Sequence, residues 1–147
     1  MIPPDIEEFM KTRHGAIRSD TDEVRAALKQ IGVSEATQFG QFFSRFNVYQ
    51  LPPAMSGDEL LDLVTPSQQI VTATNYAHDA YQIPARYVAL TSGEGEGFLL
   101  YDRESEAVYD VGIADVPSLL DGSLKPQWSS FFSFIRWYIS NPFRSKR

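Results

Sequence analysis

Apolar residues recur every three or four positions through the first third of the chain. This spacing holds over residues 20–32 and over residues 34–47, where phenylalanine repeats, and a shorter amphipathic segment precedes them. It places the apolar side chains on one side of a helix. Asp20 or Thr21 suits the N-cap of the first long segment, and Gly32 suits its C-terminal end. The pattern therefore predicts three amphipathic helices before residue 48.

Two capping boxes predict further helix starts. Residues 56–59 (Ser-Gly-Asp-Glu) place a hydroxyl three positions before a carboxylate, ahead of the leucines of residues 60–63. Residues 65–68 (Thr-Pro-Ser-Gln) repeat the arrangement, with proline at the first helical position. A stripe of apolar residues over 70–81 follows, and Pro84 ends it. We expect one short helix after each box.

Beyond Pro84 the hydrophobic period changes to two. Arg86–Ser92, Gly97–Arg103 and Ala107–Gly112 are rich in Val, Leu, Tyr and Phe and are separated by turn residues, which predicts three strands. In the middle strand both faces are apolar, since Phe98 and Leu100 alternate with Leu99 and Tyr101. This strand should therefore be central and covered on both sides.

A short helix near 116–120 and an aromatic helix over 128–139 complete the pattern. Trp137 lies on the opposite side of that last helix from Trp128 and Ile135. It is either buried by neighbouring elements or an exposed anchor for a protein partner, and burial is the favoured interpretation. The residues expected in the core are Leu100, Tyr101, Val108, Phe131, Phe132 and Ile135.

Helices, then strands, then helices predict an α+β fold, an antiparallel β-meander with helices packed on it. We expect a single domain over residues 1–147, with a core of about 20–140 and a flexible basic tail over 141–147. The chain opens without a basic start or a long apolar run, so a cytoplasmic protein without a membrane segment is expected.

The composition argues against several classes of function. The 147 residues carry 13 basic and 19 acidic side chains, a net charge of −6, and no cysteine. The acidic balance argues against nucleic-acid binding, and the absence of cysteine excludes thiolate metal sites and cysteine nucleophiles. Residues 87–121 contain eight acidic residues and one basic residue, Arg103. A basic partner is the natural complement of such a segment.

The nearest feature to an active site is Gly93-Glu94-Gly95-Glu96-Gly97. In an extended backbone its two carboxylates would lie about 6.5–7 Å apart, which overlaps the spacing of glycosidase carboxylates. A small hydrolase using Glu94 and Glu96 is therefore one hypothesis. The favoured interpretation is an acidic hairpin connection in which the glycines serve the turn.

No metal or cofactor is expected. Residues 20–23 begin like a calcium loop but lack its later ligands, and acids in the first turn of a helix explain them better. His14 and His78 stand alone, without the spacing of a histidine metal site. The sequence offers little support for a serine catalytic triad, because it has only two histidines and no nucleophile-elbow motif. We expect a protein that is not an enzyme.

Several segments together resemble the SUKH superfamily. Residues 87–102, followed by Ala107-Val-Tyr-Asp110, resemble its central meander, and residues 24–47 resemble its N-terminal half. Pro84 and the aromatic last helix also fit, so the likeness spans about residues 20–139. Two places where the family often carries glycine read Glu106-Ala107 and Val48-Tyr49 here.

The resemblance implies an α+β domain without shared catalytic residues. Bacterial members of the superfamily are immunity proteins that bind and neutralise secreted toxins, often nucleases, and fungal members regulate cell-wall synthesis. We therefore expect a non-enzymatic protein-binding domain, an immunity protein against a basic toxin. An intracellular regulatory or scaffold module is the alternative.

The acidic residues of the meander are the candidate contacts for a basic partner. Successive turns of a meander lie at opposite ends of the sheet, so the acids should form two groups. The end bearing Glu94 and Glu96 is favoured, because its glycines allow close approach. The full set of candidate contacts is Glu94, Glu96, Asp102, Glu104, Glu106 and Trp137.

Overall fold

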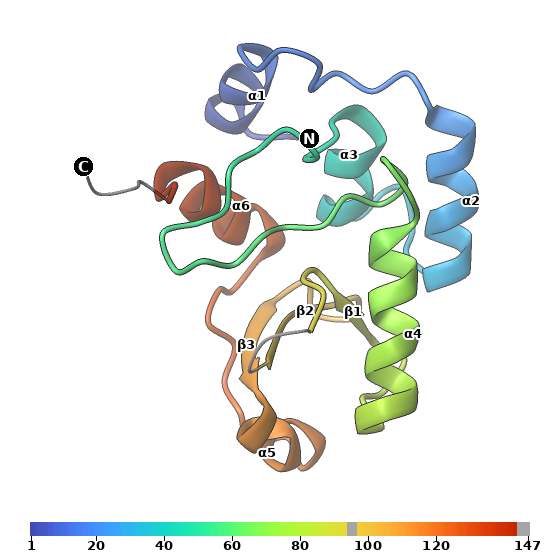
Figure 1. Cartoon of the computed structure of the whole chain (residues 1–147), viewed down its shortest axis with the longest axis vertical. Coiled ribbons are helices and arrows are strands. Elements are labelled where there is room, and N and C mark those ends of the chain that lie inside the picture. Colours follow the sequence, from blue (N-terminus) through green and yellow to red (C-terminus); the bar gives the residue numbers. More distant parts are fainter. Residues whose placement is uncertain (94–96, 144–147) are drawn as a thin grey trace.

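A three-stranded antiparallel meander lies at the centre of the fold (Figure 1). The computed structural model describes residues 1–93 and 97–143, and the sheet order is β1 (Tyr87–Ala89), β2 (Gly97–Asp102), β3 (Val108–Gly112). The predicted α+β class and meander are confirmed. The strands are shorter than the apolar runs that predicted them, most of all β1, which ends three residues before Ser92.

Both faces of β2 are buried, as its sequence predicted. Leu99 and Tyr101 belong to a larger core, with the phenylalanines of the third and last helices. Phe98 and Leu100 belong to a smaller core on the other face. Every residue predicted for the core is buried. The alternation of apolar groups along β2, and likewise along β1 and β3, thus divides the interior into two cores on opposite faces of the sheet.

Six α-helices surround this sheet within the described residues. Figure 1 shows α4 running along one side of the sheet and α5 beneath its lower end, while α3 and α6 lie above it. None of these helices is long and apolar enough to cross a membrane. Their bounds are α1 (Pro4–Lys11), α2 (Thr21–Ile31), α3 (Gln38–Arg45), α4 (Gln69–Tyr81), α5 (Val116–Leu120) and α6 (Phe131–Ser140).

Several helix ends follow from local chemistry. The left-handed Gly32, with φ of 69°, ends α2 as predicted. The Ser130 hydroxyl accepts a hydrogen bond from the Ser133 N–H at the start of α6, three residues later than predicted. Trp128 instead pairs with β3, since its backbone exchanges hydrogen bonds with Val108.

The prediction of a helix after residues 56–59 is wrong. Residues 60–63 run as an irregular connection, although Leu60 and Leu63 are buried. The Leu60 N–H donates to the Tyr138 hydroxyl (3.0 Å), and the Leu61 N–H donates to the Leu90 carbonyl (2.9 Å). Backbone groups that a helix would have paired locally are thus bonded to distant elements.

The second capping box is also absent, and α4 begins at Gln69 rather than at Pro66. The Thr65 hydroxyl donates to Asp20 (3.1 Å), and the Thr65 N–H donates to Asp62 (2.9 Å). The hydroxyl that was expected to cap the helix is therefore engaged by a carboxylate far away in the sequence.

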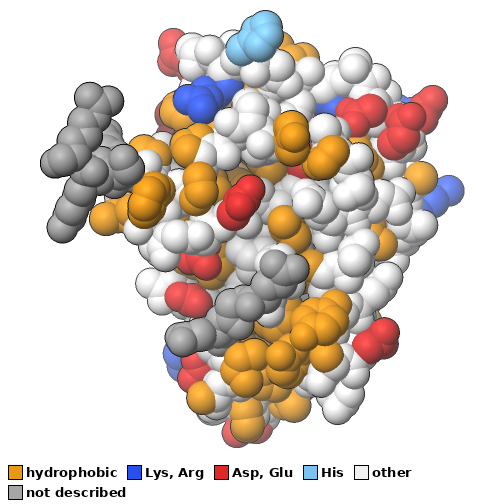
Figure 2. Space-filling view, viewed as in Figure 1, with side chains coloured by type: hydrophobic (Ala, Val, Ile, Leu, Met, Phe, Trp, Pro, Cys, Tyr) orange, Lys and Arg blue, Asp and Glu red, His pale blue; other side chains and the backbone are white. Residues whose placement is uncertain are grey.

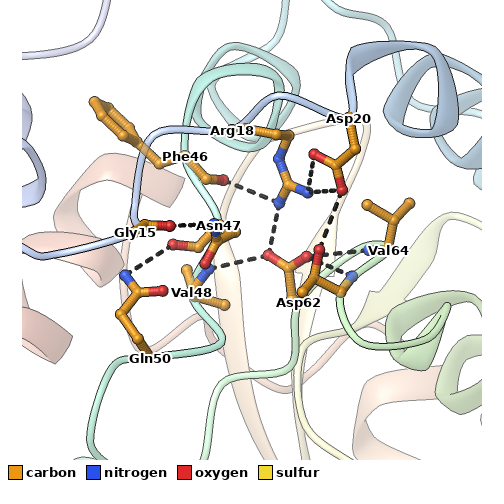
Figure 3. A network of polar contacts seen from close by, with 10 residues as sticks. Gly15, Arg18, Asp20, Phe46, Asn47, Val48, Gln50, Asp62 and Val64 are labelled. Carbon is orange, nitrogen blue, oxygen red and sulfur yellow. Dashed lines mark hydrogen bonds and ion pairs between the residues drawn. The ribbon is translucent and has the colours of Figure 1, made fainter.

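A buried ion pair between Arg18 and Asp62 anchors this connection (Figure 3). Both side chains are fully buried, and Arg18 Nη2 lies 2.7 Å from Asp62 Oδ1. The same guanidinium donates to the Phe46 carbonyl (3.1 Å) and to both oxygens of Asp20 (3.1 Å each). It thereby joins the segment before α2 to the end of α3.

The Asp62 carboxylate also accepts hydrogen bonds from backbone N–H groups. It accepts hydrogen bonds from the N–H groups of Val48 (3.0 Å) and Val64 (3.1 Å), besides that of Thr65. A buried charge is tolerated when it is paired and hydrogen-bonded, which holds for both oxygens of Asp62, whereas Arg18 Nε has no hydrogen-bond partner among the described residues. Arg18 and Asp62 therefore determine the path of the chain from residue 46 to residue 65.

The first residues of the predicted flexible tail, 141–143, are hydrogen-bonded to the fold. The Asn141 carbonyl accepts a hydrogen bond from the Met55 N–H (2.7 Å), and the Phe143 N–H donates to the Pro53 carbonyl (2.8 Å). Residues 141–143 are thus bonded to residues 53–55, and the rest of the predicted tail, 144–147, lies outside the described residues.

Shortening a side chain in the shared strand should destabilise the fold. Leu100→Ala leaves a cavity in the smaller core and should lower the free energy of unfolding by about 2–5 kcal/mol, measured by urea denaturation. Leu120→Ala, at a position that is 49% exposed, is the matched control and should change it by less than about 0.5 kcal/mol. Equal effects of the two substitutions would contradict the burial of Leu100.

Removing one charge of the buried pair should be as damaging. Asp62→Asn keeps the shape of the side chain but leaves Asp20 as the carboxylate partner of the buried Arg18, and it turns one oxygen that accepts backbone N–H groups into a donor. Unfolding should therefore become easier by about 3–5 kcal/mol. Asp22→Asn, in an exposed pair with Arg25, is the control and should change stability by less than about 1 kcal/mol. A loss below 1 kcal/mol for Asp62→Asn would show that the pair does not anchor the connection.

Candidate protein-binding site

Asp102, predicted to face a partner, is buried and bound within the fold. Arg86 holds its carboxylate with two hydrogen bonds, from Nε (3.1 Å) and from Nη2 (2.6 Å). The Glu104 N–H (2.9 Å) and the Ser105 hydroxyl (2.8 Å) donate to the same carboxylate. Asp102 therefore closes the turn between β2 and β3 and leaves no surface to a partner.

These bonds lower the pKa of Asp102. Burial alone would raise it, but the hydrogen bonds from Arg86, the Glu104 backbone and Ser105 favour the charged form and bring the pKa below its ordinary value. A carboxyl group with a lowered pKa stabilises the fold above its unfolded pKa. That stabilisation is lost as the pH falls through the folded pKa.

Glu106 is likewise used inside the fold. Its Oε1 accepts a hydrogen bond from the N–H of Gln38, the first residue of α3 (2.6 Å), and another from the Tyr101 hydroxyl (3.1 Å). A carboxylate suits this place, because the N-terminus of a helix attracts negative charge. Glu106 has a left-handed φ of 66°, a conformation that favours glycine. The two hydrogen bonds offset the strain of that backbone.

The remaining candidates on the described residues are partly available. Glu104 is exposed and lies 3.3 Å from Arg86 Nε. Trp137 is half-buried, with its ring 4.9 Å from that of Trp128 and 6.2 Å from that of Phe134. Glu94 and Glu96, the favoured contacts, lie outside the described residues.

An open hollow lies at the end of the sheet where β2 begins and β3 ends. Its volume is about 880 Å³, and Gly93 and Gly97 form part of its wall. The strand register pairs Gly97 with Gly112, which brings the residues after β3 to this end. The described wall carries four acidic side chains and no basic one: Asp58, Glu59, Asp110 and Asp115.

The acidic side chains of the hollow act on one another. Burial raises the pKa of Asp110, and the charges of Asp58 and Asp115 raise it further. Asp115 accepts a hydrogen bond from the Gly112 N–H (3.1 Å), and Asp58 accepts one from the Ser56 hydroxyl (2.7 Å). The carboxylates of Asp110 and Glu59 accept none from the described residues. These two are free to meet a cation.

The described residues form no metal centre at the hollow. Among the described residues, no three acidic or histidine side chains are grouped so that they could hold a metal ion. The hydrolase hypothesis rested on Glu94 and Glu96, which are outside the described residues.

No protein-family model matches this chain, and no curated protein matches it in sequence.

The acids of the hollow were missed for two reasons. Asp110 and Asp115 could have been found from the meander alone, because the end of β3 must lie beside the start of β2. Asp58 and Glu59 reach the hollow from an irregular connection that their capping-box pattern assigned to a helix. No local pattern predicts where that connection lies.

The bonds of Asp102 generate a pH-dependent prediction. Asp102→Asn should lower the free energy of unfolding at pH 7 by about 2 kcal/mol, because charge-assisted hydrogen bonds to a buried group are lost. The difference from the unaltered protein should shrink as the pH falls through the lowered pKa of Asp102, where the carboxylate of the folded protein becomes protonated. Urea denaturation at several pH values measures the loss of stability at pH 7 and its change with pH. Glu104→Gln, which changes the exposed partner of Arg86, is the control and should have little effect on stability at any pH. If the loss of stability caused by Asp102→Asn persisted unchanged at acidic pH, the stabilising role of the charged Asp102 carboxylate would be contradicted.

Proposed function

We propose that this chain is a non-enzymatic protein-binding domain that neutralises a basic toxin by direct contact, an immunity protein of the SUKH type. The observation that carries the proposal is the hollow at the Gly93–Gly97 end, whose described wall holds four carboxylates and no basic side chain. This is the end of the sheet that the glycine-rich acidic connection also marks in the sequence.

The chemistry of the hollow suits a cationic protein surface. Burial raises the pKa of Asp110 and the like charges of Asp58 and Asp115 raise it further, and a positive group that enters the hollow would relieve the repulsion among these carboxylates. An acidic surface also speeds encounter with a basic partner and selects against neutral ones. Nucleases carry basic surfaces for phosphate, and a domain of this charge would cover one.

The resemblance of residues 87–110 to the SUKH meander supports the same proposal. Those residues form β1, β2 and the first part of β3, and the phenylalanine-rich stretch that precedes them in the family pattern forms α3. Two of the other acids expected to meet the partner, Asp102 and Glu106, have structural roles here. The hollow is thus the better-supported contact surface.

Reversing two charges of the hollow tests the proposal. The partner is first captured from the source cell with the tagged protein, identified by mass spectrometry and assayed for toxicity. Glu59→Lys with Asp110→Lys should weaken its binding by about tenfold or more at low salt, mainly through slower association. Surface plasmon resonance measures the affinity and the rate.

The control is Glu8→Lys with Glu23→Lys, which makes the same change in net charge on exposed residues away from the hollow. It should leave the affinity within about twofold. If both pairs of substitutions weakened binding equally, the effect would be due to net charge, and the hollow would not be the interface. A captured partner without toxicity would refute the immunity role.

A further inference from the structure

A small apolar pocket lies between α1, the connection that follows α3 and the end of α6. Its volume is about 100 Å³, and its wall includes the side chains of Phe9, Leu51, Pro52, Tyr138 and Ile139. Figure 2 shows apolar side chains at the surface between α1 and the end of α6, which Figure 1 labels in the same view. Among the described residues, none lines both this pocket and the acidic hollow. The two are separate features of the surface.

Hydrogen bonds hold the walls of this pocket in place. The Tyr138 hydroxyl accepts a hydrogen bond from the Leu60 N–H and donates one to the Pro52 carbonyl, both at 3.0 Å. The Leu51 N–H donates to the Val48 carbonyl, also at 3.0 Å. Tyr138 and Leu51 are themselves buried. The pocket is therefore formed before a ligand arrives, and binding there costs little further ordering of the protein.

Arg13 is the one charged side chain in the wall of this pocket. Its guanidinium lies 5.7 Å from the centre of the Phe9 ring, and it has no ion pair or side-chain hydrogen bond with the described residues. Two other basic side chains near α1 differ in this respect, since Lys11 and Arg45 are both paired with Glu7 (3.2 and 2.8 Å). The positive charge of Arg13 is therefore available to an anion.

The pocket and its cation together call for a ligand that carries an apolar group and an anion close to each other. A volume of about 100 Å³ takes a single branched or aromatic side chain, whereas sites that enclose a whole small molecule have about 300 Å³ or more. The rest of the ligand must then stay outside, as it does when the ligand is the end of a longer chain. In the C-terminal residue of a protein, the side chain and the terminal carboxylate are attached to the same carbon atom. One can enter the pocket while the other pairs with a guanidinium through two parallel hydrogen bonds.

We propose that this pocket binds the C-terminal residue of a second protein, where that residue is an apolar one such as leucine. The apolar side chain enters between Phe9 and Ile139, and the terminal carboxylate pairs with Arg13. This site goes beyond the proposed function, because it lies apart from the hollow and selects an anion rather than a cation. The apolar walls select the side chain, and Arg13 selects a free chain end over an internal residue.

Three N-acetylated peptides test the two parts of this ligand. The first is Gly-Ser-Gly-Leu with a free carboxylate, the second has the same sequence with an amide terminus, and the third has glycine in place of leucine and a free carboxylate. Each is titrated into the full-length protein at low salt, and the chemical shifts of backbone amides report the site and the Kd. The first should bind about tenfold more tightly than either of the others, because it alone presents both a carboxylate and an apolar side chain. Its shifts should centre on Phe9, Arg13 and Ile139.

Variants then assign the preference to the pocket. Arg13→Gln should make the free and amidated leucine peptides bind equally, because only the charged terminus depends on the guanidinium. Lys29→Gln is the matched control, since Lys29 is exposed, lies outside the pocket and has no ion pair with the described residues. It removes the same charge and should leave the preference for the free carboxylate unchanged. Ile139→Ala should weaken both leucine peptides by a similar factor.

Equal binding of the free and amidated leucine peptides, or a difference that survives Arg13→Gln, would overturn the proposal. The free acid 4-methylpentanoate has a branched apolar end and a carboxylate but no peptide chain, and it should bind more weakly than the leucine peptide. Equal or tighter binding of this acid would assign the pocket to a small carboxylic acid and overturn the docking of a chain end. Each of these outcomes is independent of whether the basic partner binds at the hollow.

Discussion

The buried pair of Arg18 and Asp62 governs the placement of the candidate binding surface. The pair and its hydrogen bonds hold the chain between the end of α3 and the start of α4, where no regular secondary structure does so. That stretch carries Asp58, Glu59 and Leu61 into the wall of the hollow. A charge pair away from the surface thus positions the charges that a partner would meet. Its own net energy is small beside this role, because desolvation offsets most of the attraction between the two ions.

Secondary structure could be read from the sequence wherever a periodic apolar pattern coincided with a local end signal. The meander, the end of α2 at Gly32 and the two-sided burial of β2 are of this kind. The pattern failed over residues 56–68, where the Thr65 hydroxyl bonds to Asp20 and the Leu60 N–H bonds to Tyr138. Both of these partners are distant in sequence. For the same reason only the part of the hollow that follows from strand register was within reach of prediction.

Counting charges along the sequence overstated the acidic surface of the meander. Asp102 neutralises Arg86 and closes a turn, while Glu106 serves the N-terminus of α3 and the Tyr101 hydroxyl. Carboxylates can be recruited into a fold in this way when backbone N–H groups or a cation lie nearby. Glu59 and Asp110 accept no hydrogen bond and pair with no cation among the described residues, so these acids stay available. Availability for a partner is therefore a property of the surroundings of a charge, and local sequence composition does not report it.

The division of β2 between two cores has a consequence for how binding affects the whole molecule. Neighbouring residues of one strand pack into opposite cores, so neither core can lose its packing while the other keeps it. The fold should therefore open as one cooperative unit. A partner seated at the hollow touches Gly97 and Phe98 at the start of this strand. The binding free energy of such a partner would then add to the stability of helices at the far side of the protein as well, and the complex would resist unfolding and proteolysis throughout.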